Sequence, residues 1–248
     1  MEIIDAKTLD YKAINEALRR SDDACTIQNC CGQRFLASGM SQKDLTIYGI
    51  PGNALGAYLN NAAITVYGNG QDAVGDTMNE GQILIHGNIG DAAGYAMRGG
   101  KIYVKGNAGY RAGIHMKGIQ RKKTSYDHRR ICWKFYLGNI RQAGSSSFSV
   151  LSRNKKRIVG NFPCTGMHGG KIFLRDDCHD IKFPEQVTAR PASREDLDEL
   201  REYLSDFCSA FNYQIDDLLS APFTVITPTV KYRINRCMLQ INRKQVDL

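Results

Sequence analysis

Glycines recur every nineteen residues in the first half of this 248-residue chain. Each member of the first series ends a short run that alternates apolar and polar residues, LTIYG, ITVYG, ILIHG or IYVKG. Such alternation is typical of a strand with one buried face. A glycine at a fixed offset marks a place where the backbone needs positive φ or where another coil approaches closely. The two series are Gly49, Gly68, Gly87 and Gly106, and Gly56, Gly75, Gly94 and Gly113.

A nineteen-residue unit with one clear strand cannot bury its apolar face alone, so the units must stack. The sequence therefore predicts a fold dominated by β-structure, a right-handed parallel β-helix with 19-residue coils and several short strands in each coil. A hexapeptide solenoid is disfavoured because nineteen is not a multiple of six. Alternation of strands with helices is disfavoured because the linkers are rich in glycine, which is a poor helix former.

Two helices are predicted to flank the solenoid. Leu9, Ile14 and Leu18 indicate a short N-terminal helix, and Ser193 followed by Asp196 resembles a capping box. Because the end of a solenoid exposes unpaired strand edges, we expect the second helix to cap it. The predicted organisation is a β-helix domain with a helical lead-in, a C-terminal capping helix with a strand, and a tail, over residues 1–190, 191–230 and 231–248. The apolar stripe of the second helix consists of Leu197, Leu200, Leu204, Phe207, Cys208 and Phe211.

The repeat disappears between Ser125 and Ser152. Unstructured loops of more than about 15 residues are uncommon in compact domains. In the frame that starts on the third base of the Leu137 codon, the codons of 138–151 permit GQYQAGGVIIVLGL, which places glycine, tyrosine, isoleucine and valine where the repeat has them. A shift across 125–135 permits AMIIEGSAGNF. We therefore interpret 125–152 as a displaced reading frame that, as written, interrupts the stack.

The C-terminal tail receives the same interpretation, because the frame that starts on the third base of Lys231 permits IPYKPLYVAN. This bears on the net charge of +8. Residues 125–152 and 232–248 each carry a net charge of +3. Since most of the excess positive charge lies in these two segments, it does not predict a nucleic-acid-binding surface.

The cysteines and the absence of long apolar runs indicate the setting of the protein. None of the eight cysteines forms a CxxC pair, so we expect reduced packing cysteines in the cytoplasm. Cys164, His168 and Cys178 match no zinc spacing and lack a fourth ligand. No apolar run approaches the length of about 18 residues that a membrane span requires, and the first residues are acidic, which predicts neither a membrane span nor a secretory signal.

Catalytic motifs are not recognisable in the chain. His86 falls on the outward phase of its strand and is expected to be a solvated surface residue, while His115 and His168 are expected at coil corners. The glycine-rich turns form no complete P-loop, and there is no GxSxG elbow. Four carboxylates look singly scattered, without the clustering of a calcium site: Asp72, Asp76, Glu80 and Asp91.

The repeated G-x-x-x-x-x-x-G units, with GNAGYRAG and GNFPCTGMHGGKI, resemble the GXGXG domain of glutamate synthase. That domain is the β-helical C-terminal region of the large subunit, and it also occurs as a separate polypeptide. The segment RPASREDLDELREYLSDFCSAFNYQIDDLLSAPFTVITPTVK is similar to the stand-alone form. The resemblance runs from Met1 to Lys231, except for 125–152.

The resemblance implies a non-catalytic scaffold with no catalytic, cofactor-binding or metal-binding residue of its own. Its partners would be a glutaminase-type amidotransferase subunit and a synthase subunit that carries FMN and an iron–sulfur cluster. The assembly would make glutamate from glutamine and 2-oxoglutarate. Two alternatives stay open: a β-helix like that of the β-helical subunit of formylmethanofuran dehydrogenase, and a free-standing assembly scaffold.

Overall fold

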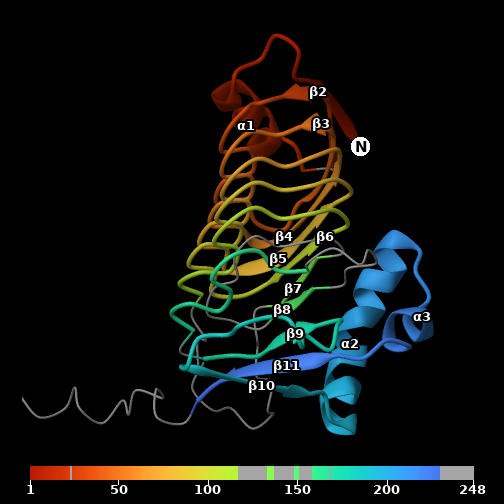
Figure 1. Ribbon diagram of the computed structural model, residues 1–248. Coiled ribbons are helices and arrows are strands. Elements are labelled where there is room, and N and C mark those ends of the chain that lie inside the picture. Colours follow the sequence, from red (N-terminus) through yellow and green to blue (C-terminus); the bar gives the residue numbers. More distant parts are fainter. Residues whose placement is uncertain (23, 117–132, 137–147, 151–157, 168, 230–248) are drawn as a thin grey trace, which may run out of the picture.

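The computed structural model describes residues 1–22, 24–116, 133–136, 148–150, 158–167 and 169–229. The chain is dominated by β-sheet. It folds into a parallel solenoid of about five turns, with about nineteen residues in each coil and a few short helices (Figure 1). The fold class predicted from the glycine spacing is thereby confirmed.

Eleven strands form one sheet in the described part of the chain. Strands β1 to β9 are parallel neighbours in chain order, and β11 and then β10 extend the sheet in antiparallel pairing. The strands are β1 (Glu2–Asp5), β2 (Cys25–Cys31), β3 (Asp44–Ile50), β4 (Asn60–Tyr67), β5 (Glu80–Ile85), β6 (Lys101–Val104), β7 (Trp133–Tyr136), β8 (Phe148–Val150), β9 (Ile172–Leu174), β10 (Val187–Pro191) and β11 (Thr224–Pro228). The helices are α1 (Tyr11–Arg20), α2 (Arg194–Phe211) and α3 (Ile215–Leu219).

The register of the sheet follows the sequence repeat. Leu45 of β3 pairs with Ile64 of β4, Ile64 pairs with Ile83 of β5, and Ile83 pairs with Ile102 of β6. All four side chains are buried in the interior of the solenoid. Because successive partners are nineteen residues apart, each coil adds the same apolar side chain to a continuous stack.

In the coils that the structure describes from β3 to β6, the chain between successive strands forms turns rather than further regular strands. In the coil after β3, Ala54, Gly56 and Tyr58 have left-handed φ values of +61°, +63° and +57°. The Ala54 N–H donates to the carbonyl of Asp72 in the next coil, and the Gly56 N–H donates to the carbonyl of Leu36 in the preceding coil, both at 2.9 Å. The left-handed residues at alternate positions therefore hydrogen-bond to both neighbouring coils without β-geometry. The additional short strands that the sequence predicts are not present in this coil.

Helix α1 closes the N-terminal end of the solenoid (Figure 1). Its Ile14 and Leu18 side chains are fully buried against the first coil. Asn15, which is 5% exposed, donates from Nδ2 to the Phe35 carbonyl at 2.9 Å and accepts from the Ala37 N–H at 2.8 Å. The predicted N-terminal helix is thus present, and a buried amide fixes it to the chain it covers.

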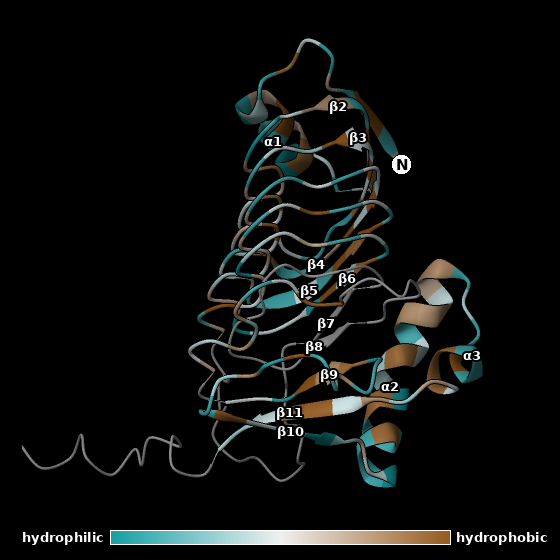
Figure 2. Cartoon of the chain, in the orientation of Figure 1, coloured by the Kyte–Doolittle hydropathy of each residue, from teal (hydrophilic) through white to brown (hydrophobic). Residues whose placement is uncertain are grey.

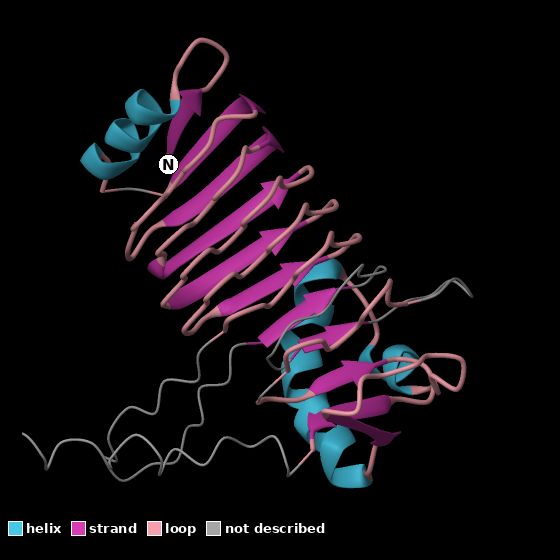
Figure 3. Cartoon of the chain, turned by 60° about the vertical axis from the view of Figure 1, so that its left-hand side comes forward, coloured by secondary structure: helices cyan, strands magenta, loops and turns pink. Residues whose placement is uncertain are grey.

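Helix α2 lies against the outward face of the sheet, alongside its C-terminal half (Figures 1 and 3). A second apolar cluster joins Tyr103 of β6 and Phe173 of β9 to the helix residues Leu204, Phe207 and Phe211. Figure 2 shows apolar residues on the helix and on the strands near it. The helix was predicted as an end cap. It covers a face of the sheet instead, because large aromatic side chains on the outward phase of the strands give its apolar stripe a surface to bury.

The ladder continues through β7 and β8, where the sequence analysis predicted an interrupted stack. Strand β7 pairs in parallel with β6, and β8 pairs in parallel with β7 and β9. The short runs WKFY and FSV supply aromatic and β-branched residues that suit strands. Most of the proposed displaced frame, and the tail from residue 230 onward, lie outside the described residues.

Candidate functional site

The first glycine series lies at or just after the carboxyl ends of the strands, where consecutive coils come closest. A Cβ atom on Gly68 would lie 2.0 Å from the carbonyl oxygen of Gly49. At Gly87 and Gly106, a Cβ would lie 2.2 Å and 2.4 Å from an asparagine Oδ1 of the preceding coil. The preceding coil fills the space that each glycine leaves, so no room remains there to cradle a phosphate.

The second series forms the left-handed turns that face the interior. Gly56, Gly75, Gly94 and Gly113 have φ values of +63°, +67°, +59° and +73°. A Cβ on Gly75 would lie 2.5 Å from Cδ1 of Ile102. Glycine adopts the left-handed conformation without strain, and at Gly56 and Gly75 the absence of a Cβ leaves space for the stacked isoleucine side chains. These two glycines therefore have a packing role.

Side-chain ladders run along the turns, and the sequence analysis did not identify them. The Oδ1 of Asn53 accepts from the Asp72 N–H at 3.2 Å. The Oδ1 of Asp72 accepts from the Asp91 N–H, and the Oδ1 of Asp91 accepts from the Tyr110 N–H, both at 2.7 Å. Asp72 and Asp91 are therefore not singly scattered carboxylates, because they occupy the same position in successive coils. Their nineteen-residue spacing was the signal that could have identified them.

An asparagine ladder lies beside the first glycine series. The Oδ1 of Asn69 accepts from the Asn88 N–H, and the Oδ1 of Asn88 accepts from the Asn107 N–H, both at 2.8 Å. Each bond satisfies a backbone donor of the next coil that would otherwise need another partner. The turn side is therefore held by side chains as well as by the backbone.

An aromatic row of Tyr48, Tyr67 and His86 follows the outward phase of β3 and β4 and the residue after β5. The rings of Tyr48 and Tyr67 are stacked with centroids 5.1 Å apart and planes at 11°. Tyr67 and His86 are stacked at 4.4 Å and 21°. Phe211 of α2 meets His86 edge-on at 5.1 Å and 81°. The aromatic row therefore leads from the exposed sheet face directly into the contact with α2.

The position of His86 corrects the expectation of a solvated surface histidine. Its side chain is half-buried between Tyr67 and Phe211. Burial, with a smaller effect from the charge of Lys105, lowers the pKa of His86 below its ordinary value. Sequence phase predicted the outward direction of this residue correctly, but it could not indicate that a helix more than a hundred residues later would cover it.

A polar contact holds the C-terminal part of α2 to strand β6. Lys101 and Asp206 form an ion pair, and the hydroxyl of the buried Tyr103 donates to Asp206 Oδ2 at 3.2 Å. Burial, followed by the negative charge of Asp206, raises the pKa of Tyr103 far above its ordinary value. Tyr103 therefore stays protonated and serves as a hydrogen-bond donor in this contact.

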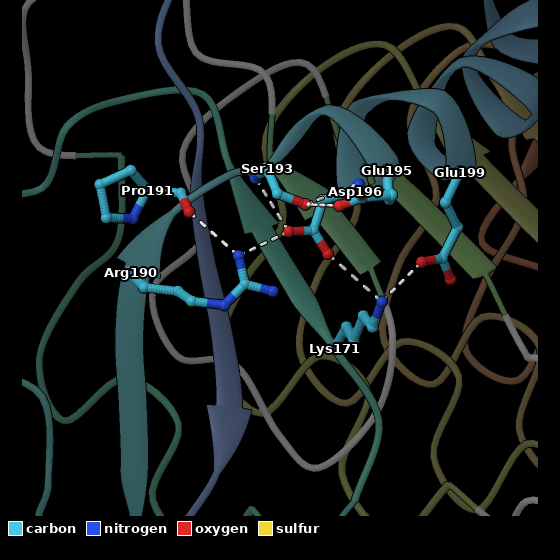
Figure 4. Close-up of polar contacts among 7 residues, drawn as sticks. All are labelled: Lys171, Arg190, Pro191, Ser193, Glu195, Asp196 and Glu199. Atoms are coloured by element: carbon cyan, nitrogen blue, oxygen red, sulfur yellow. Dashed lines mark hydrogen bonds and ion pairs between the residues drawn. The ribbon is translucent and has the colours of Figure 1, made fainter.

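The N-terminus of α2 is anchored by Asp196, which is 3% exposed (Figure 4). Its Oδ2 accepts from the Ser193 N–H at 3.0 Å, and the Ser193 hydroxyl accepts from the Asp196 N–H at 3.3 Å, which confirms the predicted capping box. Arg190 Nη1 lies 2.6 Å from Asp196 Oδ2, and Lys171 Nζ lies 3.4 Å from Oδ1. Lys171 also pairs with Glu199 at 2.6 Å.

The charge state of Asp196 follows from these partners. Burial alone would raise its pKa, but hydrogen bonds from Arg190 and from Ser193 outweigh that effect and hold the pKa of Asp196 well below its usual range. The carboxylate is therefore ionised at neutral and mildly acidic pH. The signal in the sequence was the Ser193–Asp196 spacing, whereas the arginine and lysine partners come from β10 and from the residue before β9.

The described cysteines are reduced thiols, and all of them except Cys31 are buried. Burial raises the pKa of Cys164 to about 12 and that of Cys178 to about 11. Both thiols are therefore neutral near pH 7 and poor metal ligands. His168 lies outside the described residues. Cys208 packs in the cluster beneath α2, as predicted.

Other chemistry is sparse among the described residues. Within them, no group of three or more histidine, cysteine, aspartate and glutamate residues is arranged to hold a metal ion. His115 has a φ of +55°, which confirms the predicted coil corner, and its ring lies edge-on to Tyr95 at 5.4 Å. None of the described helices is long and apolar enough to cross a bilayer.

A hollow of about 490 Å³ lies at the strand starts, across the outward face of the sheet from the aromatic row. It is lined along the strand starts by Asp44, Ala63, Gln82 and Lys101, which are partners in the sheet register. Since Lys101 also pairs with Asp206, the hollow begins where the contact with α2 ends. The uncovered sheet face between this hollow and the aromatic row is the candidate functional site.

Comparison with known proteins agrees with this architecture. A family model described as the GXGXG motif matches residues 5–122, which include all eight glycines of the two series. The uncharacterized protein MJ1350 of Methanocaldococcus jannaschii is 36% identical over 250 residues, and the alignment covers 92% of this chain and 93% of that protein. The chain belongs to the GXGXG motif family.

Proposed function

We propose that the chain is a non-catalytic β-helical scaffold subunit of glutamate synthase. In this role it would hold a glutaminase-type amidotransferase subunit and a synthase subunit that carries FMN and an iron–sulfur cluster. The assembly would convert glutamine and 2-oxoglutarate into two molecules of glutamate at the expense of reducing equivalents. The family membership supports this role, and the resemblance to the stand-alone form of the glutamate synthase domain suggests the partners.

The observation that carries the proposal is the filling of the glycine turns. Motif glycines of a nucleotide site leave space for phosphate oxygens to approach the backbone. At Gly68 that space holds the carbonyl of Gly49, and at Gly75 it holds the side chain of Ile102. The defining motif of the family is therefore used in this chain to stack coils, which suits a scaffold.

The donor chemistry of the described residues supports the same role. An iron–sulfur cluster is held by several cysteine thiolates. Cys164 and Cys178 are neutral buried thiols, and the described residues offer no cluster of ligands around them. An iron–sulfur cluster therefore fits a partner subunit better than the described residues of this chain.

The test is purification of the tagged full-length chain from its native cells at low ionic strength. We expect it to copurify with a flavoprotein that has the absorbance of FMN and an iron–sulfur cluster, together with a glutaminase-type subunit. The complex should form glutamate from glutamine and 2-oxoglutarate with a reductant, and the isolated chain should form none. Recovery of the chain alone, or with a molybdenum or tungsten enzyme, would refute the proposal and favour the free-standing scaffold or the formylmethanofuran dehydrogenase alternative.

A further inference from the structure

We infer that the synthase partner docks a short amphipathic helix, collinear with α2, on the uncovered outward face of strands β3 to β5. This inference rests on the proposed function, because it takes the partner from it. It identifies the surface of the scaffold that makes the contact. The argument starts from the point at which α2 ends.

The interface between α2 and the sheet stops before the sheet does. The apolar stripe of α2 ends at Phe211, and Asn212, with left-handed φ of +56°, turns the chain away toward α3. Phe211 contacts His86, which follows β5. Beyond it, none of the described helices lies over the outward residues of β3 and β4, and Figure 1 shows β2 and β3 past the end of α2.

The surface beyond α2 has the same plan as the covered part. Under α2, the helix lies over Tyr103, with an ion pair to Lys101 on one side and a ring contact to His86 on the other. The residue of β5 in register with Tyr103 is Leu84. In the two strands beyond β5, the residues in the same register are Thr65 of β4 and Thr46 of β3. The central line of the face is therefore lower there, because threonine is smaller than tyrosine.

The two borders of this lowered strip are also in place. The positions in register with Lys101 line the hollow of about 490 Å³. The positions in register with His86 are the stacked rings of Tyr67 and Tyr48. The result is a shallow trough over Thr46 and Thr65, with the hollow along the strand starts on one side and the aromatic ridge of Tyr67 and Tyr48 on the other, in line with α2.

The aromatic ridge is exposed although it is apolar. Tyr48 and Tyr67 are each 48% exposed, and Ile50 beside them is 42% exposed. Neighbouring apolar residues exposed together are a common mark of a protein contact, and tyrosine is enriched among residues that dominate binding energy. The stacked rings are also already ordered, so little side-chain entropy is lost when a partner covers them.

The dimensions of the trough fit about two helical turns. Neighbouring strands are about 4.8 Å apart, so the distance from β5 to β3 is roughly 10 Å. With a rise of 1.5 Å per residue, a helix of about seven to eight residues covers it. Its apolar side would repeat the spacing of Leu204, Phe207 and Phe211, which is the pattern that this face already accepts.

A matched pair of substitutions separates this surface from the rest of the solenoid. Tyr48→Lys places a charge on the ridge, whereas Tyr58→Lys makes the same change at a tyrosine that is 53% exposed on the turn side. Each variant replaces the full-length chain in its native cells. The flavin and iron–sulfur absorbance recovered per scaffold chain is then measured, together with the melting temperature and the oligomeric state of each purified chain.

We expect wild type and Tyr58→Lys to retain the flavoprotein, and Tyr48→Lys to retain at least tenfold less with an unchanged melting temperature. Equal recovery with all three chains would overturn the docking surface and leave the proposed function standing. If wild type retains no flavoprotein, the proposed function fails, and the inference fails with it. A wild-type dimer that Tyr48→Lys converts into monomers would also overturn the inference, because the occupant of the trough would then be a second copy of the chain.

Discussion

The ring of Phe211 in α2 lies edge-on against the ring of His86, with centroids 5.1 Å apart and planes at 81°. His86 is stacked on Tyr67 at the same time. This one imidazole therefore joins the solenoid to the helix that covers it. Its ionisation state bears on both contacts, because a charged ring at a half-buried position must be desolvated.

The first prediction concerns the pH dependence at His86. Because its pKa is lowered in the folded chain, the unfolded chain binds the proton first as the pH falls below about 6.5. The contribution of His86 to stability is therefore complete above that pH and is lost as the pH falls through the lower folded pKa. We expect the stability of the wild type to fall more between pH 8 and pH 5 than that of His86→Tyr, which continues the tyrosines of the aromatic row.

The measurement is urea unfolding of both chains at several pH values. His179→Gln is the control, because His179 is exposed and its ring lies 3.7 Å from Asp177, away from the aromatic row. Its stability should follow the wild-type curve. Parallel curves for wild type and His86→Tyr would show that His86 keeps its ordinary pKa in the folded chain.

The second prediction concerns the close approach of coils at Gly68. A Cβ there would lie 2.0 Å from a backbone carbonyl that cannot move without disturbing its own coil. We expect Gly68→Ala to lower the free energy of unfolding by about 3 kcal/mol or more, as overpacking against a fixed backbone does. Thermal or urea unfolding of the full-length chain measures this loss.

Two further glycines serve as controls for this variant. A Cβ on Gly169 would have no neighbour within 4 Å, so Gly169→Ala should change stability by less than about 0.5 kcal/mol. Gly39 has equal space but a φ of +67°, so Gly39→Ala should lose about 1 to 2 kcal/mol from backbone strain alone. Equal effects at Gly68 and Gly39 would refute the steric explanation.

The sequence could predict the features that follow a fixed spacing along the chain, but it could not predict tertiary contacts that occur only once. The isoleucine stack, the two glycine series and the capping box at Ser193 follow from fixed spacings, and the structure contains all of them. The side-chain ladder through Asp72 has the same spacing, but it begins with asparagine at Asn53 and continues with aspartate, so composition hid it. The docking of α2 on the sheet face depends on contacts such as Phe211 with His86, which no local pattern encodes.

The third prediction concerns the anchor of α2. Asp196→Ala removes the reciprocal cap with Ser193 and leaves Arg190 and Lys171 without their shared carboxylate. Arg190 and Lys171 are partly exposed, so water replaces part of the loss, and we expect about 2 to 3 kcal/mol of destabilisation. In urea unfolding, Asp198→Ala in the same helical turn should stay within about 0.5 kcal/mol of wild type.

The acid dependence of this anchor has a definite sign. Because the pKa of Asp196 is lowered in the folded chain, its contribution is complete above the unfolded pKa of about 3.9 and declines as the pH falls through the folded pKa. The difference between wild type and Asp196→Ala should therefore shrink when unfolding is measured at pH 2 rather than at pH 7. An unchanged difference would show that the loss comes from packing and not from charge.

The spacing of strands changes where the reading frame was interpreted as displaced. Successive partners from β3 to β6 are nineteen residues apart. Val104 then pairs with Tyr136, thirty-two residues later, Tyr136 pairs with Val150, fourteen residues later, and Val150 pairs with Leu174, twenty-four residues later. Fourteen residues are five too few for a coil of this solenoid. The sheet is thus completed with strands whose spacing does not follow the repeat.

The fourth prediction is that the coding DNA, read in one uninterrupted frame, gives AMIIEGSAGNF and GQYQAGGVIIVLGL in place of the segment within 125–152. A chain with these peptides would regain the glycines and the alternating residues that the other coils use to stack. We expect it to melt at a higher temperature and to aggregate less than the present chain, because its coils would follow the nineteen-residue spacing and each would pair its backbone with its neighbours. Sequencing of the locus and thermal unfolding of both chains check this. Codons that cannot encode the two peptides, or equal melting temperatures, would mean that the irregular spacing belongs to the protein itself.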